Sequence, residues 1–107
     1  MGKNHYSVYV IELDPRVWNH TRFRAANPGH DITKPCVYVG MTGLAISERL
    51  LNHRRGYKSN SFVERYGVRL LPLLYARLNP MSHRMAVLTE VMLAEKLRND
   101  GYAVWQA

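Results

Sequence analysis

Two short runs of β-branched and aromatic residues constrain the fold of this chain most. Residues 6–13 read YSVYVIEL, and residues 36–40 read CVYVG. Such runs are typical of β-strands, in which successive side chains point to opposite faces. Tyr9 and Ile11 therefore fall on one face of the first strand, and Val8 falls on the other. The chain is expected to build a sheet around these two runs.

Helical segments are expected between and after these strands. Asp14 and Pro15 suit an N-cap and the first helical position, which predicts a short basic helix over residues 15–26 within an extended loop at about 14–35. Ser82 is expected to cap a long last helix, and Gly101 to end it. The other expected helices lie at 45–55, 61–66 and 83–100, and two extended segments are expected at 68–78 and 102–105. Pro72 cannot donate a backbone hydrogen bond, so it is expected at an edge or a bulge of the first of these segments.

The length of the chain limits how these elements combine. With 107 residues, one compact domain over residues 1–107 is expected. The order β-α-β-α-α-β-α predicts an α/β (α+β) fold, with a small three-stranded, mainly antiparallel sheet flanked by helices.

Charge and cysteine content narrow the classes of partner and site. Lysine and arginine number 15 against 8 acidic residues, a formal net charge of +7. A surface this basic favours nucleic acid and, less often, an anionic membrane, although a generically soluble basic protein stays open. The single cysteine, Cys36, excludes an intrachain disulfide and a zinc site of several thiolates. With no signal-peptide pattern and no apolar run long enough for a bilayer, a cytoplasmic protein is expected.

Two tyrosine motifs on the expected strands resemble those of the GIY-YIG nuclease superfamily. Residues Ser7-Val8-Tyr9 match Gly-Ile-Tyr, with serine in place of the first glycine, and Tyr38-Val39-Gly40 match Tyr-Ile-Gly. Thr42 follows closely, as a threonine or serine often does in that family. The loop between the two tyrosines is longer than in many members, and it looks like an elaboration of a subfamily.

The resemblance continues on two helices. Arg49 and His53 match the arginine of the next helix and the histidine one turn later, a spacing that puts both on one helix face. Glu90 lies 12 residues before Tyr102, where the family carries its metal-binding glutamate. The matching positions thus span nearly the whole chain in the family's order.

A metal-dependent endonuclease, with DNA as the expected substrate, is what the resemblance implies. Glu90 would hold one Mg²⁺ or Mn²⁺ ion, with water and phosphate filling its other positions. Arg49 would turn inward and stabilise charge on the scissile phosphate, and Tyr9 would be the general base. Tyr38 would orient the water or contact the phosphate. His53 would assist proton transfer or phosphate binding.

Glu90 also stands out without the resemblance. Residues 85–94 read MAVLTEVMLA and hold this one charge, and helical spacing gives Glu90 the same face as Ala86, Leu93 and Leu97. A carboxylate among apolar residues costs several kcal/mol unless it gains a partner or a metal. The plain alternative is a solvated carboxylate at the rim of the apolar stripe.

A basic segment follows the second strand. Residues 49–69 hold six arginines and lysines against Glu64, interleaved with Tyr57 and Tyr66. Such a surface suits phosphate backbones. The residues predicted to contact nucleic acid are Arg22, Arg24, Thr42, Arg54, Arg55 and Lys58, and Asn60 is expected to cap its helix.

Two other classes of function stay open. One is a catalytically silent nucleic-acid-binding module on the same fold. The other is a basic structural protein of a ribonucleoprotein, in which the tyrosines belong to the core. No added DNA-recognition module is expected within these residues, so specificity is expected to come from the loop at 14–35, from a protein partner or from a homodimer.

Overall fold

The structure of the protein, a computed structural model, describes residues 4–106. Its strands are β1 (Ser7–Leu13), β2 (Cys36–Thr42), β3 (Gly67–Leu70) and β4 (Ala103–Gln106). Its α-helices are α1 (Thr21–Ala25), α2 (Ile46–Arg54), α3 (Ser61–Tyr66) and α4 (His83–Asn99). Short 3₁₀ helices lie between them: η1 (Pro15–Asn19), η2 (Pro72–Leu74) and η3 (Ala76–Leu78).

The strands form one four-stranded sheet in the order β3-β1-β2-β4. β1 pairs antiparallel with both β2 and β3, whereas β4 runs parallel to β2. The α+β class is therefore confirmed, and the predicted three-stranded sheet is wrong. The tail expected at 102–105 supplies the fourth strand, in which Ala103 and Val104 are fully buried. Four residues carry too little alternation to reveal a strand from sequence.

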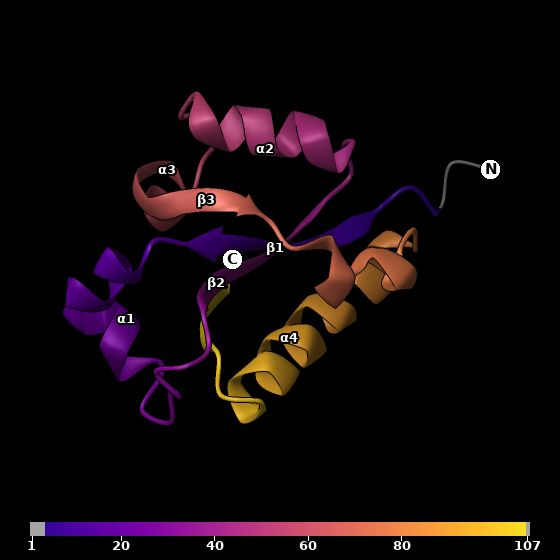
Figure 1. The fold of residues 1–107 in the computed structure, drawn as a ribbon. Coiled ribbons are helices and arrows are strands. Elements are labelled where there is room, and N and C mark those ends of the chain that lie inside the picture. The colour runs from indigo at the N-terminus through magenta and orange to yellow at the C-terminus, as the bar shows by residue number, and fades with distance from the viewer. Residues whose placement is uncertain (1–3, 107) are drawn as a thin grey trace.

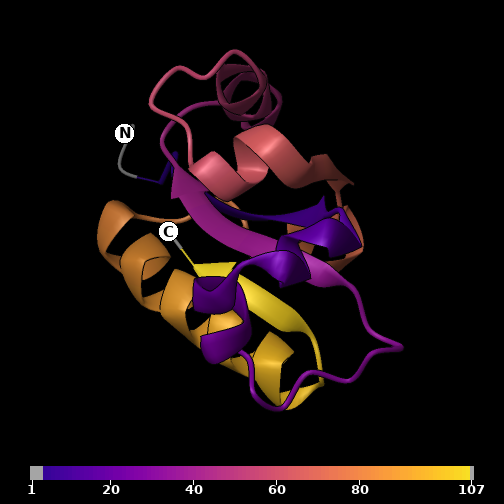
Figure 2. The same ribbon diagram turned by 90° about the vertical axis from the view of Figure 1, so that its left-hand side faces the viewer.

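Helices cover both faces of the sheet (Figures 1 and 2). α4 lies along one face, and α1, α2 and α3 lie on the other. On the α1 side, Phe23 and Phe62 pack against Trp105 of β4, with ring centroids 6.4 and 5.0 Å from it. On the α4 side, Ala86 and Ala94 are fully buried. The core thus has two layers separated by the sheet.

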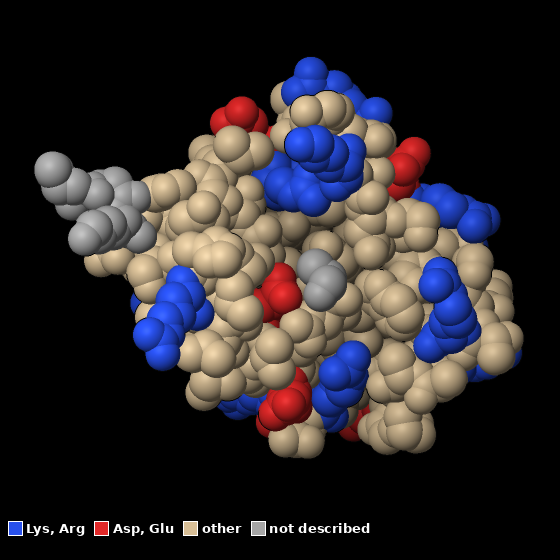
Figure 3. Space-filling view, turned by 180° about the vertical axis from the view of Figure 1, so that it is seen from behind, with Lys and Arg blue, Asp and Glu red and all other residues tan. Residues whose placement is uncertain are grey.

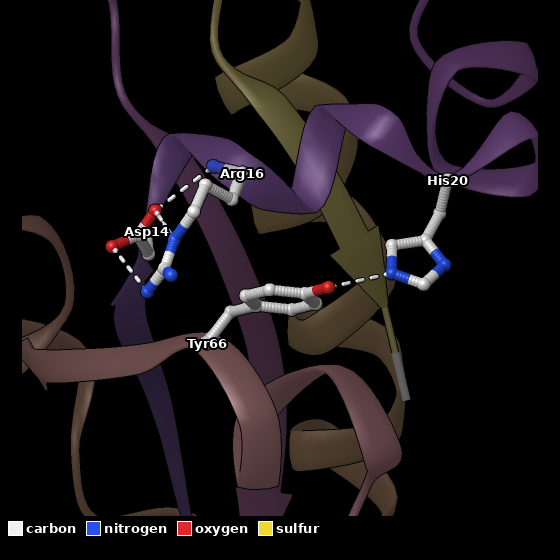
Figure 4. A network of polar contacts seen from close by, with 4 residues as sticks. All are labelled: Asp14, Arg16, His20 and Tyr66. Carbon is white, nitrogen blue, oxygen red and sulfur yellow. Dashed lines mark hydrogen bonds and ion pairs between the residues drawn. The ribbon is translucent and has the colours of Figure 1, made fainter.

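The helix predicted over residues 15–26 is broken at His20. η1 ends and α1 begins there, because the His20 backbone is extended (φ −87°, ψ 124°). Its ring nitrogen Nε2 lies 2.7 Å from the hydroxyl of Tyr66, which ties this corner to the end of α3 (Figure 4). The predicted cap is confirmed: the carboxylate of Asp14 accepts the backbone N–H of Arg16 at 2.9 Å (Figure 4).

The extended segment predicted at 68–78 is mostly wrong. Only Gly67–Leu70 form a strand, and the turns η2 and η3 follow. Pro72 starts η2, where its fixed φ and missing N–H suit the first position of a helical turn better than a ladder.

The predicted start of α3 and both predicted ends of α4 are confirmed. The Ser82 hydroxyl accepts the N–H of Met85 at 3.2 Å, and the Asn60 side chain accepts the N–H of Phe62 at 2.9 Å. Gly101 ends α4 with φ +98°, a conformation that favours glycine.

Candidate functional site

Tyr9 and Tyr38 lie side by side on one face of the sheet. In the β1–β2 register, Tyr9 is opposite Gly40 and Tyr38 is opposite Ile11, so both rings project toward the α2 side. Their ring centroids are 6.2 Å apart. Both side chains are almost fully buried, at 1% and 2% exposure.

The glycine of the second motif makes room for the tyrosines. A Cβ atom on Gly40 would lie 2.7 Å from both Cζ and the hydroxyl oxygen of Tyr9, and 2.9 Å from Cε2 of Tyr38. Real Cβ atoms do not approach other heavy atoms so closely. Any residue other than glycine would therefore push the two rings away from their present positions.

His53 of α2 contacts the hydroxyl of Tyr9. Its Nε2 lies 2.9 Å from that oxygen, and its Nδ1 accepts the backbone N–H of Asn60 at 3.3 Å. Burial lowers the pKa of His53 to about 4, so the ring is neutral at pH 7. Because Nδ1 is an acceptor, the single ring proton lies on Nε2, which donates to Tyr9. Asn60 thereby fixes the tautomer of His53.

Arg49, one turn before His53 on α2, also faces Tyr9. Its guanidinium donates to the carbonyl of Lys58 at 2.9 Å, which holds α2 against the following loop. Burial raises the pKa of Tyr9, and the positive charge of Arg49 opposes that rise. Burial, followed by the neighbouring Tyr9, raises the pKa of Tyr38 as well. Arg49, and to a smaller extent the hydroxyl of Tyr38, thus favours a negative charge on the Tyr9 oxygen.

Glu90 reaches this cluster from the other side of the sheet. α4 packs on the face opposite the tyrosines, so Glu90 approaches them from a different side of the sheet than Arg49 and His53 do. β4 is an edge strand, and its Gln106 donates Nε2–H to Oε1 of Glu90 at 3.0 Å. The negative charge of Glu90 contributes to the raised pKa of both Tyr9 and Tyr38. The carboxylate therefore lies near the hydroxyls, across the sheet edge.

The second carboxylate oxygen of Glu90 has no partner. Oε2 is buried and finds no hydrogen-bond donor among the described residues. Burial raises the pKa of Glu90, and the hydrogen bond from Gln106 partly offsets that effect. A buried carboxylate oxygen without a donor is costly, and a cation would relieve the cost.

A divalent ion would find one protein ligand here. Within residues 4–106, no three histidine, cysteine or acidic side chains come close enough together to form a metal cage. Mg²⁺ commonly uses one or two carboxylates and fills its other positions with water and phosphate oxygens. Glu90, with its unpartnered Oε2, fits that manner of binding.

The residues predicted to contact nucleic acid lie in separate groups. Arg54 and Arg55 at the end of α2 donate to the carbonyl of Val68 and the side chain of Asn52, and the Lys58 ammonium lies over the ring of Tyr57. In Figure 3, basic side chains gather over α2 at the top of the molecule, and others stand apart below. The face drawn there carries no continuous basic band.

The other predicted contacts are on α1 and at the end of β2. The Arg22 guanidinium lies 5.4 Å from the ring centroid of Phe62 and 5.6 Å from that of Trp105. Arg24 donates to the carbonyl of Trp18 at 2.7 Å. Thr42 is buried, and its hydroxyl accepts the N–H of Leu44 at 3.0 Å, so it shapes the turn after β2.

Two contributors to the site were not foreseen from sequence: Gln106, and Asn60 in its contact with His53. Asn60 was expected only as a helix cap, and nothing in the sequence marks the last strand as a partner of Glu90. Comparisons with protein-family models, curated proteins and solved structures gave no match. None of the helices in the described part of the chain has the length and apolar character needed to cross a membrane.

Proposed function

We propose that this chain hydrolyses phosphodiester bonds in nucleic acid, with DNA as the expected substrate, in the manner of a GIY-YIG nuclease using one Mg²⁺ or Mn²⁺ ion. The observation that carries the proposal is the meeting of two features at one sheet edge. One is the Tyr9 oxygen, which faces His53 and Arg49. The other is the carboxylate of Glu90, which has an unpartnered oxygen.

The residues around Tyr9 suit a proton acceptor. His53 Nε2–H donates to its oxygen, and Arg49 favours the negative charge that the oxygen carries after losing its proton. Tyrosine has an ordinary pKa of about 10, so such help is needed for base catalysis near neutrality. In the proposal Tyr9 first releases its own proton to bulk solvent, and the resulting phenolate, stabilised by Arg49, takes a proton from the attacking water. Tyr38 orients that water or the phosphate.

Two positive groups, Arg49 and the divalent ion, would stabilise the negative charge of the phosphate. Arg49 approaches from α2 and stabilises negative charge on the non-bridging oxygens. When bound at Glu90, the divalent ion would act as a Lewis acid toward the leaving oxygen. The cluster thus offers a base, a cationic donor and a metal ligand, which phosphodiester hydrolysis requires.

Exposed basic residues support a nucleic-acid substrate. Arg54, Arg55 and Lys58 follow closely after Arg49 in the chain, at and beyond the end of α2, and all three are exposed. The formal net charge of +7 adds a general attraction to polyanions. Contacts to phosphates would position a strand without reading its sequence.

Glu90→Gln tests the proposal because it keeps the shape of the side chain and removes the charge that would hold the ion. We expect cleavage to fall about a thousandfold, which corresponds to the several kcal/mol that a metal ion supplies. Nucleic-acid binding without metal should change less than about twofold, because it depends on lysine and arginine. Glu48→Gln, an exposed site on α2, is the matched control and should cleave normally.

One observation favours the two candidates without catalysis, a silent nucleic-acid-binding module and a basic structural protein of a ribonucleoprotein. Tyr9, Tyr38 and His53 are nearly or fully buried, as core residues are. A panel of plasmid, single-stranded, flap and RNA substrates with Mg²⁺ or Mn²⁺ separates both from the nuclease. Salt-dependent binding without cleavage of any substrate would support the silent module and overturn the nuclease. Normal cleavage by Glu90→Gln would remove Glu90 from the site.

A further inference from the structure

The outer face of α4 is unusually apolar for an exposed helix surface. In the described part of the chain no second α-helix lies on this side of the sheet, so the outer face of α4 points away from the molecule (Figures 1 and 2). Five large apolar side chains on it are between 40% and 67% exposed: Met85, Val87, Leu88, Val91 and Met92. A contiguous patch of this kind marks an interaction surface more often than isolated exposed residues do.

A groove extends this patch sideways. It has a volume of about 680 Å³ and lies between α4 and the segment of η2 and η3. Met85 and Met92 line it on the helix side, and Leu73 and Leu78 line it on the other. Leu73 is 92% exposed. The apolar surface is therefore wider than one helix stripe.

Two opposite charges lie on the same stripe. Arg84 and Glu95 stand four residues before and seven residues after Leu88, spacings that put all three along one line of the helix. Both charged side chains are exposed, and neither forms an ion pair within the described part of the chain. The stripe thus carries a positive charge near its start, an apolar centre and a negative charge near its end.

We infer that a second copy of this chain docks on α4, with the two helices antiparallel about a two-fold axis. A two-fold interface joins the same surface patch of both copies, so the patch must be complementary to itself when the second copy runs in the opposite direction. Centred between residues 89 and 90, the antiparallel arrangement sets Leu88 level with Val91 of the other copy. It also sets Arg84 level with Glu95, twice by symmetry, and on the same side of the interface.

The positions of Arg84 and Glu95 along α4 favour a second copy of the chain, in antiparallel orientation, as the partner. A parallel pairing would bring Arg84 near Arg84 and Glu95 near Glu95, and like charges across an interface are unfavourable. The antiparallel pairing satisfies both charges with residues of the same chain. A helix pair of this length buries an area at the low end of specific interfaces, so the oligomeric state must be measured over a wide range of concentration.

The dimer does not depend on the proposed function. Glu90 and the tyrosines are on the inner side of α4 or beyond the sheet, so they take no part in the contact. A failure of cleavage and a failure of dimerisation would therefore be separate results.

Charge reversal tests the dimer by sedimentation of the full chain from micromolar to sub-millimolar concentration. Arg84→Glu and Glu95→Arg should each weaken the dimer at least about a hundredfold, because each sets like charges opposite one another twice. The double variant Arg84→Glu/Glu95→Arg should restore it. Arg65→Glu, on α3, repeats the charge change elsewhere and should leave the dimer unchanged.

Three outcomes would overturn the inference. The unmutated chain could remain monomeric at every concentration, which would leave the face to a different partner. Both single variants could dimerise normally, which would place the interface elsewhere. The double variant could also fail to restore the dimer although its circular dichroism and thermal melt match those of the unmutated chain.

Discussion

Two buried polar side chains, Asn27 and Glu90, show opposite ways of placing polar atoms inside this small protein. Asn27 is 3% exposed, and every polar atom of its side chain is used. Its Nδ2 donates to the carbonyls of Phe23 and Val104 at 2.9 and 3.0 Å. Its Oδ1 accepts from the backbone N–H of Val104 at 2.6 Å and from Nε of Arg98 at 3.3 Å.

Glu90 is nearly as buried, at 7% exposure, and is far less satisfied. It accepts one hydrogen bond, from Gln106, and its Oε2 has no donor in the described part of the chain. A fully bonded buried amide stabilises the join between α1, β4 and α4. A buried carboxylate with an unpartnered oxygen lowers the stability of the fold, and such a group is typical of a site that binds a ligand. Burial alone would not distinguish them, whereas hydrogen-bond satisfaction does.

The largest loss of folding stability is expected for a substitution at Asn27. Asn27→Ala removes four hydrogen bonds and leaves the buried N–H of Val104 without this acceptor. We expect the free energy of unfolding to fall by about 3 kcal/mol. For a domain of this size the melting temperature should fall by roughly 15 °C. Asn99→Ala, at the exposed end of α4, is the control and should stay within about 0.5 kcal/mol. Equal melts for both variants would refute a structural role for Asn27.

Overpacking of the tyrosine cluster should lower the folding stability by an intermediate amount. Gly40→Ala adds a Cβ atom 2.7 Å from the Tyr9 hydroxyl, so the rings must shift. Overpacking of this kind costs about 2 kcal/mol. Under the proposed function, cleavage should fall together with stability. In Gly29→Ala the same Cβ atom meets nothing within 4 Å, so this variant should melt as the unmutated chain does. Indistinguishable melts for the two variants would contradict the tight packing around Gly40.

The smallest effect concerns Glu90 and depends on pH. Its pKa in the folded state is raised, so folding favours the protonated carboxyl. The stability of the chain relative to Glu90→Gln is therefore greatest below the unfolded pKa and is lost as pH rises through the folded pKa. Denaturant titrations of both proteins at a series of pH values around the pKa of Glu90 measure this difference in the free energy of unfolding. The contribution of His53 cancels, because both proteins contain it. A difference that does not vary with pH would mean that Glu90 is solvated.

The same two proteins test the ion without any cleavage assay. Mn²⁺ at ten times its Kd should stabilise the unmutated chain by roughly 1.4 kcal/mol. Glu90→Gln should gain almost nothing, and Glu48→Gln should gain as much as the unmutated chain. An equal gain in all three would mean that the ion binds elsewhere.

Much of the local structure could be predicted from the sequence. The caps at Asp14 and Ser82 and the stop at Gly101 depend on a few neighbouring residues, and each was predicted correctly. The first two strands were also predicted, because their β-branched runs are strong signals. The tail at 102–105 was predicted to be extended, but its pairing with β2 could not be predicted, because that pairing joins distant parts of the chain. The break at His20 could not be predicted either, since the His20 ring binds Tyr66, 46 residues away.

The sequence by itself determined the class of the fold, the basic charge and the presence of one carboxylate in the apolar stretch at residues 85–94. These depend on composition and on spacing within one element. Only the tertiary structure decided that Tyr9 meets His53, and that Glu90 approaches the tyrosines around a sheet edge instead of from their own face. Such contacts join residues 44 and more positions apart. Their geometry follows from how the sheet and helices pack together, which no local pattern encodes.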